Sequence, residues 1–157
     1  MDAALACRPI GHLETPWKRR EDCPRNGRAV VPPPECRAVV DEAYRPGLAS
    51  LETFSHLILL YWLDRPREGA GELVFTPPFD DTPRGIFATR APHRPNPIGL
   101  SVVRLLGIEG GTLCVHYLDC LDGTPLLDIK PYLPRTDSEP EATMGWLARR
   151  HERKVSP

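Results

Sequence analysis

The stretch ATRAPHRPNPIGLSVVRL, residues 88–105, concentrates side chains that could bind an anionic ligand. It contains three arginines, one histidine and one asparagine among three prolines. A proline fixes its own φ angle and pushes the preceding residue towards extended geometry, so the segment is preshaped and loses little freedom on binding. Composition alone favours a rigid strand connection with solvated arginines. A binding arm is the alternative, and it needs support from elsewhere in the chain.

A pair of carboxylates, Asp119 and Asp122, stands just before a Gly-Thr-Pro sequence. Asp122 followed by Gly123 is by itself typical of a turn. Carboxylates at the end of a buried strand are costly unless they find hydrogen-bond donors, so the pair could also bind a ligand. A second basic stretch, residues 17–28, holds five basic side chains against two acidic ones. The sequence thus offers two positive segments and one acidic pair as candidate binding elements.

Several familiar catalytic and nucleotide-binding patterns are missing. Residues 69–71 read Gly-Ala-Gly, but they follow the preceding apolar run too late and no helix can start after them, so a flexible loop is the better interpretation. The chain has no G-x-x-x-x-G-K-[ST] loop and no G-x-S-x-G element. Its five histidines are scattered and its five cysteines include no C-x-x-C pair, so we expect no metal site. His56 begins an apolar run and is expected to be structural.

Length and charge restrict the class of protein further. A chain of 157 residues has the size of one domain that can fold without disulfides or metals. The formal net charge of -1 disfavours nucleic-acid binding by bulk charge but leaves local clusters available. The cysteines are odd in number and unclustered, and neither a signal peptide nor a membrane-spanning apolar run is evident. We therefore expect a cytoplasmic protein.

The candidate binding residues must be positioned by a mainly β framework. The apolar run at 56–63 predicts a central strand, 124–133 predicts a further strand, and an opening strand is expected around 10–13. A short helical turn is expected at 45–54. The 19 prolines are typical of rigid loops that join strands. No internal repeat or second core is evident, so residues 1–157 are predicted to form a single mainly β domain.

A tight hairpin is predicted at residues 109–112, which read Glu-Gly-Gly-Thr. In its second arm Leu113, Val115 and Tyr117 should share one face, and both faces are largely apolar, as in a barrel wall or between layers. The one long helix is expected at about 138–154, where a serine can cap its start and basic side chains suit its last turns.

Four stretches taken together resemble one known family. They are GIFATRAPHRPNPIGLSVVRL, LDGTPLLDIKPY, GLASLETFSHLILLY and IGHLETPW. They resemble the TsaA-like (TrmO) family of S-adenosylmethionine-dependent tRNA methyltransferases, over residues from about 10 to 138. The resemblance implies a compact β-barrel-like domain, usually a homodimer, that binds S-adenosylmethionine without a Rossmann fold. Characterised members methylate the amide-like nitrogen of threonylcarbamoyl adenosine beside the anticodon of tRNA, so tRNA is the implied partner.

The family's cofactor contacts carry over onto this chain position by position. The S-adenosylmethionine contacts that the resemblance implies are Pro24, Arg25, Asn26, Leu63, Asp64, Arg65, Arg90, Leu100, Asp119, Cys120, Leu121 and Asp122. Two positions depart from the family pattern: Asn26 stands where a glutamine is usual, and Asp64 stands where a histidine is common. These departures affect the expected acceptor specificity more than the expected binding of the cofactor.

Methyl transfer restricts what the charged residues can do. The acceptor nitrogen, the methyl carbon and the sulfur must lie in line, so positioning is the main task of the protein. The sulfonium loses its positive charge during transfer, so a carboxylate packed against it would stabilise the ground state more than the transition state. We therefore expect Asp119 and Asp122 to contact a hydroxyl or amine of the cofactor, and Arg25 or Arg90 to bind its carboxylate.

The acceptor side is less defined by the sequence. An amide-like nitrogen is a poor nucleophile whose proton must leave, so a catalytic base could help, and His93, Asp119 and Asp122 are the candidates. His93, Arg94 and Asn96 are expected to face the acceptor. Two other functions use the same pocket: an S-adenosylmethionine-binding regulator, and a methyltransferase that acts on a small molecule.

Overall fold

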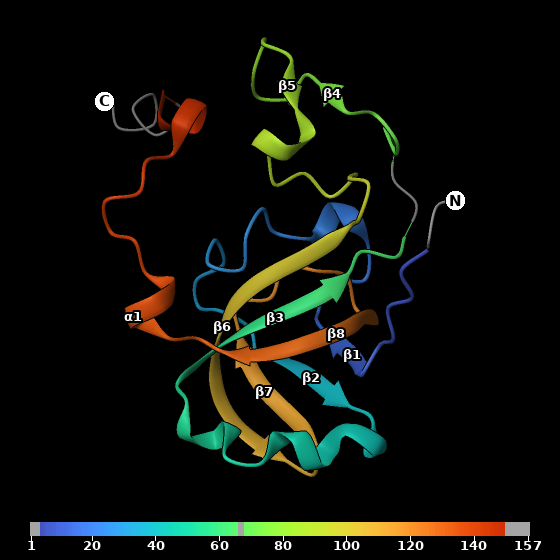
Figure 1. The fold of residues 1–157 in the computed structure, drawn as a ribbon, viewed down its shortest axis with the longest axis vertical. Helices are drawn as coiled ribbons and strands as arrows, with labels where there is room; N and C mark the ends of the chain where they lie inside the picture. Colours follow the sequence, from blue (N-terminus) through green and yellow to red (C-terminus); the bar gives the residue numbers. More distant parts are fainter. Residues whose placement is uncertain (1–3, 66–67, 150–157) are drawn as a thin grey trace.

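The computed structural model describes residues 4–65 and 68–149. Within these residues six strands close into an antiparallel barrel in the order β1-β2-β7-β6-β3-β8. Figure 1 labels these strands in the body of the molecule. The barrel strands are β1 (Gly11–Glu14), β2 (Cys36–Val40), β3 (His56–Trp62), β6 (Ile98–Glu109), β7 (Thr112–His116) and β8 (Thr124–Pro131). The expectation of a mainly β, barrel-like fold is therefore confirmed.

Alternation along the strands fills the interior of the barrel. In β3 the side chains of Leu57, Leu59 and Tyr61 are buried, and those between them are only half-buried. A strand places successive side chains on opposite faces, so every second residue points inward. The main aliphatic side chains of the core are Leu13, Ala38, Val40, Leu57, Leu59, Val103, Leu113, Val115 and Leu126. A packed interior leaves the ends of the barrel as the places for a ligand site.

The second arm of the predicted hairpin is shorter than expected. The β6–β7 turn uses two glycines with positive φ, as its sequence indicates. β7 ends at His116 because Tyr117 takes a φ of 82°. Tyr117 therefore does not share the buried face of Leu113 and Val115, contrary to expectation. The turned backbone instead brings Leu118 into the core.

Two 3-10 helices lie across one end of the barrel, as Figure 1 shows. They are η2 (Glu42–Leu48) and η3 (Leu51–Thr53), within the stretch expected to form a helical turn. Leu48 and Leu51 from these helices, and Phe54 just after them, pack against the core. This end of the barrel is therefore closed by apolar side chains.

Between β3 and β6 the chain leaves the barrel and forms a small excursion beyond the other end (Figure 1). The excursion contains β4 (Val74–Phe75), β5 (Arg84–Gly85) and η4 (Ile86–Ala88). β4 and β5 pair as a two-stranded antiparallel sheet, and Ile86 donates its N–H to the carbonyl of Leu73 at 2.8 Å. The proline-rich segment then returns the chain to β6, so both of its ends are attached to ordered elements.

The long helix expected from Ser138 does not form in the described residues. α1 covers only Pro134–Asp137, and Ser138 after it is extended. Glu139 precedes Pro140, which disfavours helical geometry at Glu139. The short η5 (Gly145–Leu147) follows, and the last part of the predicted helix lies outside the described residues. No helix in the described ranges is long and apolar enough to cross a membrane.

Trp146 shows what holds the C-terminal segment in place instead. Its indole Nε1 donates to the carbonyl of Ala88 at 2.8 Å. Its ring stacks on Phe79 with 6.0 Å between ring centroids, and the guanidinium of Arg84 lies 4.6 Å from its centroid. These contacts attach the segment to the excursion. They are made by a segment that is not a continuous helix from Ser138.

Candidate functional site

A pocket of about 610 Å³ opens where β3 ends and β6 begins. Four segments line it: the loop between β1 and β2, the end of β3, the proline-rich arm with the start of β6, and the loop after β7. The lining residues are Arg20, Cys23, Pro24, Arg25, Asn26, Tyr61, Leu63, Arg90, Ala91, Pro92, Arg94, Ile98, Gly99, Leu100, Asp119, Cys120 and Leu121. The volume is that of a typical small-molecule site.

The pairing of β3 with β6 positions the strand residues of the pocket. Tyr61 is the cross-strand partner of Gly99, and Leu63 donates its N–H to the carbonyl of Pro97 at 2.8 Å. A Cβ added at Gly99 would lie 2.1 Å from Cε2 of Tyr61. Only glycine allows the tyrosine ring to lie across the strand here. The glycine of the Pro-Ile-Gly sequence is thus required by packing at the floor of the pocket.

A short hydrogen-bond network lies at that floor. The phenol of Tyr61 donates to Oδ1 of Asp119 at 3.1 Å and lies 2.8 Å from Oγ of Ser101. Asp119 is the one acidic side chain among the described lining residues. Burial raises the pKa of Asp119, and the Tyr61 hydrogen bond and the charge of Arg90 lower it in part. Burial, and after it the charge of Asp119, raises the pKa of Tyr61, so the phenol keeps its proton at neutral pH.

Four arginines line the pocket with this single carboxylate. Arg94 donates from Nη1 to two carbonyls of its own arm, both at 3.0 Å, which holds the guanidinium in place. Arg90 donates from Nη2 to the carbonyl of Leu100 at 3.4 Å. The other two are Arg20, the first residue of η1 (Arg20–Asp22), and Arg25. Guanidinium groups bind carboxylates and phosphates, so the pocket suits a ligand that combines an anionic group with a donor for Asp119.

The structure brings most of the site residues expected from the sequence into this pocket. Those that line it are Pro24, Arg25, Asn26, Leu63, Arg90, Arg94, Leu100, Asp119, Cys120 and Leu121. Those outside its lining are Asp64, Arg65, His93, Asn96 and Asp122. Of the two departures from the family pattern, Asn26 therefore changes the pocket wall, whereas Asp64 is exposed beyond the end of β3 and removes no group from the wall.

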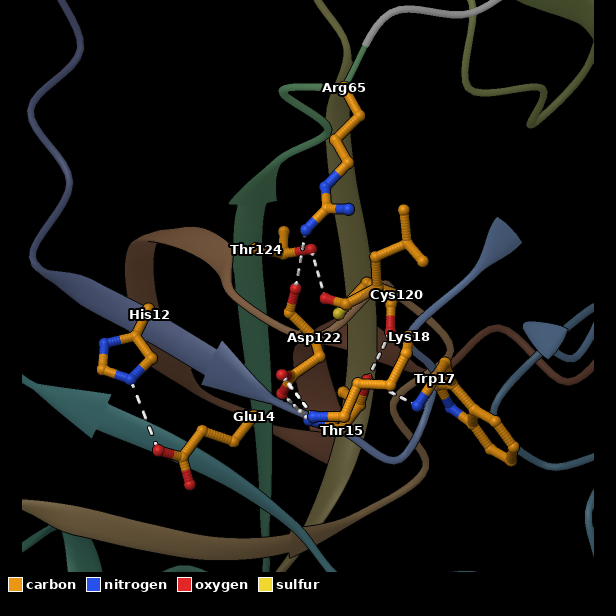
Figure 2. A network of polar contacts seen from close by, with 10 residues as sticks. His12, Glu14, Thr15, Trp17, Lys18, Arg65, Cys120, Asp122 and Thr124 are labelled. Carbon is orange, nitrogen blue, oxygen red and sulfur yellow. Dashed lines mark hydrogen bonds and ion pairs between the residues drawn. The ribbon is translucent and has the colours of Figure 1, made fainter. Parts of the chain in front are cut away.

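Asp122 belongs to a network beside the pocket, which Figure 2 shows. Its Oδ1 accepts the N–H of Thr15 at 3.0 Å, and its Oδ2 accepts Nζ of Lys18 at 2.5 Å. The Lys18 hydrogen bond holds the pKa of Asp122 below its usual value. Arg65 donates from Nη2 to the carbonyl of Asp122 at 3.3 Å. Asp122 and Arg65 thus lie outside the pocket wall, where their polar groups hold neighbouring loops together. The cofactor contact expected of them stays a prediction.

Two threonines shape the loop that carries Asp119 (Figure 2). Thr15 donates from Oγ1 to the carbonyl of Cys120 at 2.8 Å, and Thr124 donates from Oγ1 to the carbonyl of Leu121 at 2.6 Å. Burial raises the pKa of the Cys120 thiol to about 12. That thiol is therefore protonated at neutral pH, and Cys120 contributes to the wall as a small apolar group rather than as a nucleophile.

His93 and Asn96 were expected to face the acceptor, but neither lines the pocket. The ring of His93 contacts Phe75 of the excursion edge-on, with 4.5 Å between centroids, and its Nε2 is buried without a hydrogen-bond partner among the described residues. A general base must reach the proton that it removes, and His93 is not in the pocket wall, so its role as a base stays a prediction. Asn96 is exposed, and its carbonyl accepts the N–H of Ile98 at 2.7 Å.

Tyr61 and Gly99 are the site residues that the sequence did not reveal. Alternation along 56–63 places Tyr61 on the inward face near the end of its strand, and this signal could have identified it. No local pattern pairs it with Gly99, because the register between distant strands is set only on folding. The other lining residues not anticipated are Arg20, Cys23, Ala91, Pro92 and Ile98.

A second hollow of about 720 Å³ lies at the start of β3 and the end of β8, near His56 and Tyr132. None of the expected site residues lines it. Nδ1 of His56 lies 2.8 Å from Oγ of Ser55, as suits the structural role expected of this histidine. In the ranges that the structure describes, no three histidine, cysteine, aspartate or glutamate side chains gather as metal ligands.

The chain is similar to proteins with known names. A family model described as the tRNA-methyltransferase O N-terminal domain matches residues 12–138. An S-adenosyl-L-methionine-binding protein of Archaeoglobus fulgidus is 45% identical over 133 residues, which are 85% of this chain and 93% of that protein. A human tRNA (adenine(37)-N6)-methyltransferase is 33% identical over 148 residues, which are 92% of this chain and 33% of that protein.

The solved structures agree with the sequence comparisons. A crystal structure of TrmO from Pseudomonas aeruginosa matches with a TM-score of 0.74 and 34% identity, over 92% of this chain and 63% of that chain. The chain spans only part of several relatives, including 37% of a longer probable S-adenosyl-L-methionine-binding protein of Archaeoglobus fulgidus. The family model nevertheless covers most of the chain and all of the barrel from His12 onward. The chain therefore belongs to the family of tRNA-methyltransferase O N-terminal domains.

Proposed function

We propose that this chain is an S-adenosylmethionine-dependent methyltransferase that acts on tRNA. Its acceptor is the amide-like nitrogen of threonylcarbamoyl adenosine next to the anticodon. The observation that carries the proposal is the pocket, in which four arginines accompany one half-buried carboxylate. The names of two relatives support it, since one is an S-adenosyl-L-methionine-binding protein and the other a tRNA (adenine(37)-N6)-methyltransferase.

The chemistry of the pocket wall fits S-adenosylmethionine, which supplies an activated methyl group on a sulfonium when bound. Arg25 or Arg90 would bind the carboxylate of its methionine part. Asp119 would accept a hydrogen bond from its amine or from a ribose hydroxyl. Leu63 and Leu100, which line the pocket, offer apolar contact for the adenine ring. No feature of a Rossmann fold is needed for this arrangement.

Asp119 is assigned to binding rather than to proton removal. Of the three base candidates, only Asp119 lines the pocket, whereas His93 and Asp122 lie outside it. Its Oδ1 accepts the phenol of Tyr61, and we assign its second oxygen to the ligand. A carboxylate close to the sulfonium would oppose the loss of positive charge during transfer, so Asp119 serves best on an amine or hydroxyl further along the cofactor. The acceptor proton then leaves to water.

The excess of arginines supports an anionic acceptor. One guanidinium is enough for the single carboxylate of the cofactor, whereas four line the pocket. We assign Arg94 to a phosphate or to the threonyl carboxylate of the acceptor, because two backbone carbonyls hold its guanidinium in place. Holding the acceptor in line with the methyl group is the main catalytic contribution of such a contact. His93 and Asn96 would meet only parts of the acceptor that lie outside the pocket.

We also propose that the chain works as a homodimer in the cytoplasm. Ile98 and Leu100 line the pocket and remain 44% and 46% exposed, which leaves apolar surface at its mouth. A second copy that covered this surface would bury it and enclose the pocket. Disulfides are not seen among the cysteines of the described residues, which suits a reducing compartment. Light scattering of the purified protein tests the dimer, and a monomer at micromolar concentration would contradict it.

The test of the reaction is mass spectrometry of tRNA nucleosides. A strain lacking the gene should lose methylated threonylcarbamoyl adenosine, and the wild-type gene should restore it. Purified protein with S-adenosylmethionine should methylate tRNA from the deletion strain. Arg94→Ala is the matched variant, and it should retain the cofactor while losing affinity for tRNA. Unchanged nucleosides in the strain and in the purified reaction would rule out the proposed function.

Two outcomes of the same test identify the other functions. Cofactor binding without any change in nucleosides would indicate a regulator. Cofactor turnover with a small molecule, but not with tRNA, would indicate a small-molecule methyltransferase. The exposed position of Asp64 gives the regulator no support, since that departure does not alter the pocket wall.

A further inference from the structure

The phenol of Tyr61 is held from two sides at the floor of the pocket. The side chain is 3% exposed, and its hydroxyl contacts both Ser101 and Asp119. An ionised carboxylate only accepts hydrogen bonds, so the phenol proton goes to Asp119. Ser101, which is also buried, then donates to the phenol oxygen. A directed chain of hydrogen bonds therefore runs from Ser101 through Tyr61 to Asp119.

One strand provides both the surface and the partner that fix this phenol. Gly99 and Ser101 are two residues apart on β6, so they point to the same face. The ring of Tyr61 lies against Gly99, where a Cβ would meet it at 2.1 Å, and its hydroxyl reaches Ser101. The ring thus has little freedom to move along or away from β6. Asp119 lies in the loop after β7 and accepts the hydrogen bond of this phenol.

We propose that Tyr61 is a positioning residue that fixes the carboxylate of Asp119 for ligand binding. The phenol occupies Oδ1 and leaves the second oxygen to the ligand. Ser101 and Gly99 support the phenol in turn. The inference rests on the proposed function, in which Asp119 binds the amine or a ribose hydroxyl of S-adenosylmethionine. It adds two residues, Tyr61 and Ser101, that were not among the expected contacts.

The charged and titratable groups that face Asp119 determine the sign of the effect. They are the phenol of Tyr61 from β3, the guanidinium of Arg90 from the arm and the adjacent thiol of Cys120. Burial raises the pKa of Asp119, whereas the Tyr61 hydrogen bond and Arg90 lower it. Removing the phenol hydroxyl therefore raises the pKa of Asp119 further. Ligand binding that needs the ionised carboxylate is then lost at a higher pH.

The first experiment measures Asp119 without any ligand. Carbon NMR of the side-chain carboxyl groups, assigned by comparison with Asp119→Asn, follows its titration in the wild type and in Tyr61→Phe. We expect the Asp119 signal to titrate at a higher pH in Tyr61→Phe and, by a smaller amount, in Ser101→Ala. Tyr132→Phe removes a phenol outside the pocket and should leave the titration unchanged. An unchanged titration in Tyr61→Phe overturns the inference.

The second experiment measures S-adenosylmethionine binding by calorimetry as a function of pH. Tyr61→Phe should weaken binding by about tenfold at neutral pH, less than the loss of the Asp119 contact itself, because the carboxylate remains but is no longer held in place. It should also move the acid limb of the binding curve to higher pH. In the Asp119→Asn background, Tyr61→Phe should have little further effect, because the two residues act as one unit. Equal losses in both backgrounds, with an unmoved acid limb, would show a merely structural tyrosine and overturn the inference.

The two experiments separate this inference from the proposed function. A wild-type protein that binds S-adenosylmethionine but leaves tRNA unmodified contradicts the proposed acceptor and leaves the Tyr61 result standing. A wild-type protein that does not bind S-adenosylmethionine contradicts the proposed cofactor, and with it the ligand assigned to Asp119. The NMR titration then still decides whether Tyr61 controls the carboxylate.

Discussion

Asp119 and Asp122 lie in one loop, yet their surroundings shift the pKa of the carboxylate in opposite directions. At the pocket floor, Asp119 is half-buried and burial raises its pKa. Beside the pocket, Asp122 accepts a backbone N–H of Thr15 and the ammonium of Lys18, and its pKa is lowered. A carboxylate satisfied by the protein stabilises the fold, whereas one that burial penalises keeps an oxygen for a ligand. The difference is the basis for proposing Asp119 as the binding residue and Asp122 as a structural one.

The largest effect that sharpens this comparison is expected at Gly99, beneath Tyr61. Gly99→Ala places a Cβ 2.1 Å from the buried ring, so we expect a loss of about 3 kcal/mol in the free energy of unfolding, at the upper end of the usual cost of overpacking. Gly107→Ala on the same strand is the matched control, because no atom lies within 4 Å of its added Cβ. Urea unfolding of both variants measures the difference. Equal stabilities would mean that the pocket floor is not rigid.

The next largest effect is expected for Asp119→Asn. Affinity for S-adenosylmethionine should fall by about 30-fold, since a hydrogen bond to a charged group is lost. The folded-state pKa of Asp119 is raised, so its ionised form costs stability at neutral pH, and this cost disappears as the pH falls below the unfolded value of about 3.9. The variant should therefore melt at a higher temperature than the wild type at pH 7. Calorimetry and thermal melts give both quantities, and a lower melting temperature would contradict the assignment.

Asp122→Asn should show the reverse pattern. We expect a loss of about 1 kcal/mol in the free energy of unfolding and little change in cofactor affinity. The folded-state pKa of Asp122 is lowered, so its contribution is present above the unfolded value of about 3.9 and is lost as the pH falls through the folded value. The difference from the wild type should therefore shrink in acid. Denaturant curves at neutral and acid pH measure it, and a large loss of affinity would place Asp122 back in the site.

The smallest effect is expected for Lys18→Met. The lysine side chain is 68% exposed, and an ion pair at that exposure contributes about 0.5 kcal/mol or less. Added salt should remove even this difference, because exposed charges are screened. Thermal melts at low and high salt test the expectation. A loss of unfolding free energy as large as that of Asp122→Asn would show that the hydrogen bond from Lys18, rather than that from the Thr15 backbone, provides most of the stabilisation by Asp122.

Local patterns predicted the framework well. The apolar run at 56–63, the Gly-Gly hairpin and the segment at 124–133 became β3, the β6–β7 turn and β8. The helix expected from Ser138 was wrong over residues 138–147, where the segment is attached to the excursion through Trp146, and its last part lies outside the described residues. Periodicity and capping are short-range signals, and they carry no information on a contact between residues 58 positions apart.

The candidate site divides in the same way. The resemblance and the residue types identified Arg25, Arg90, Leu100 and Asp119, all of which line the pocket. Chemistry alone could not separate Asp119 from Asp122, because the separation depends on which donors reach each carboxylate. Nor could it show that His93 packs on Phe75 of the excursion rather than facing the pocket. These outcomes depend on the loop after β7 and on the path of the chain between β3 and β6.

The sequence by itself determined the barrel strands other than β2 (Cys36–Val40), the stiff basic arm and the family, because alternation, proline geometry and motif chemistry depend on neighbouring residues. Only the tertiary structure decided that Tyr61 lies over Gly99 and donates to Asp119. That arrangement requires β3, β6 and the loop after β7 to meet in one register. Register between distant strands is selected by the burial of whole faces, so it is a property of the closed barrel and not of any single segment.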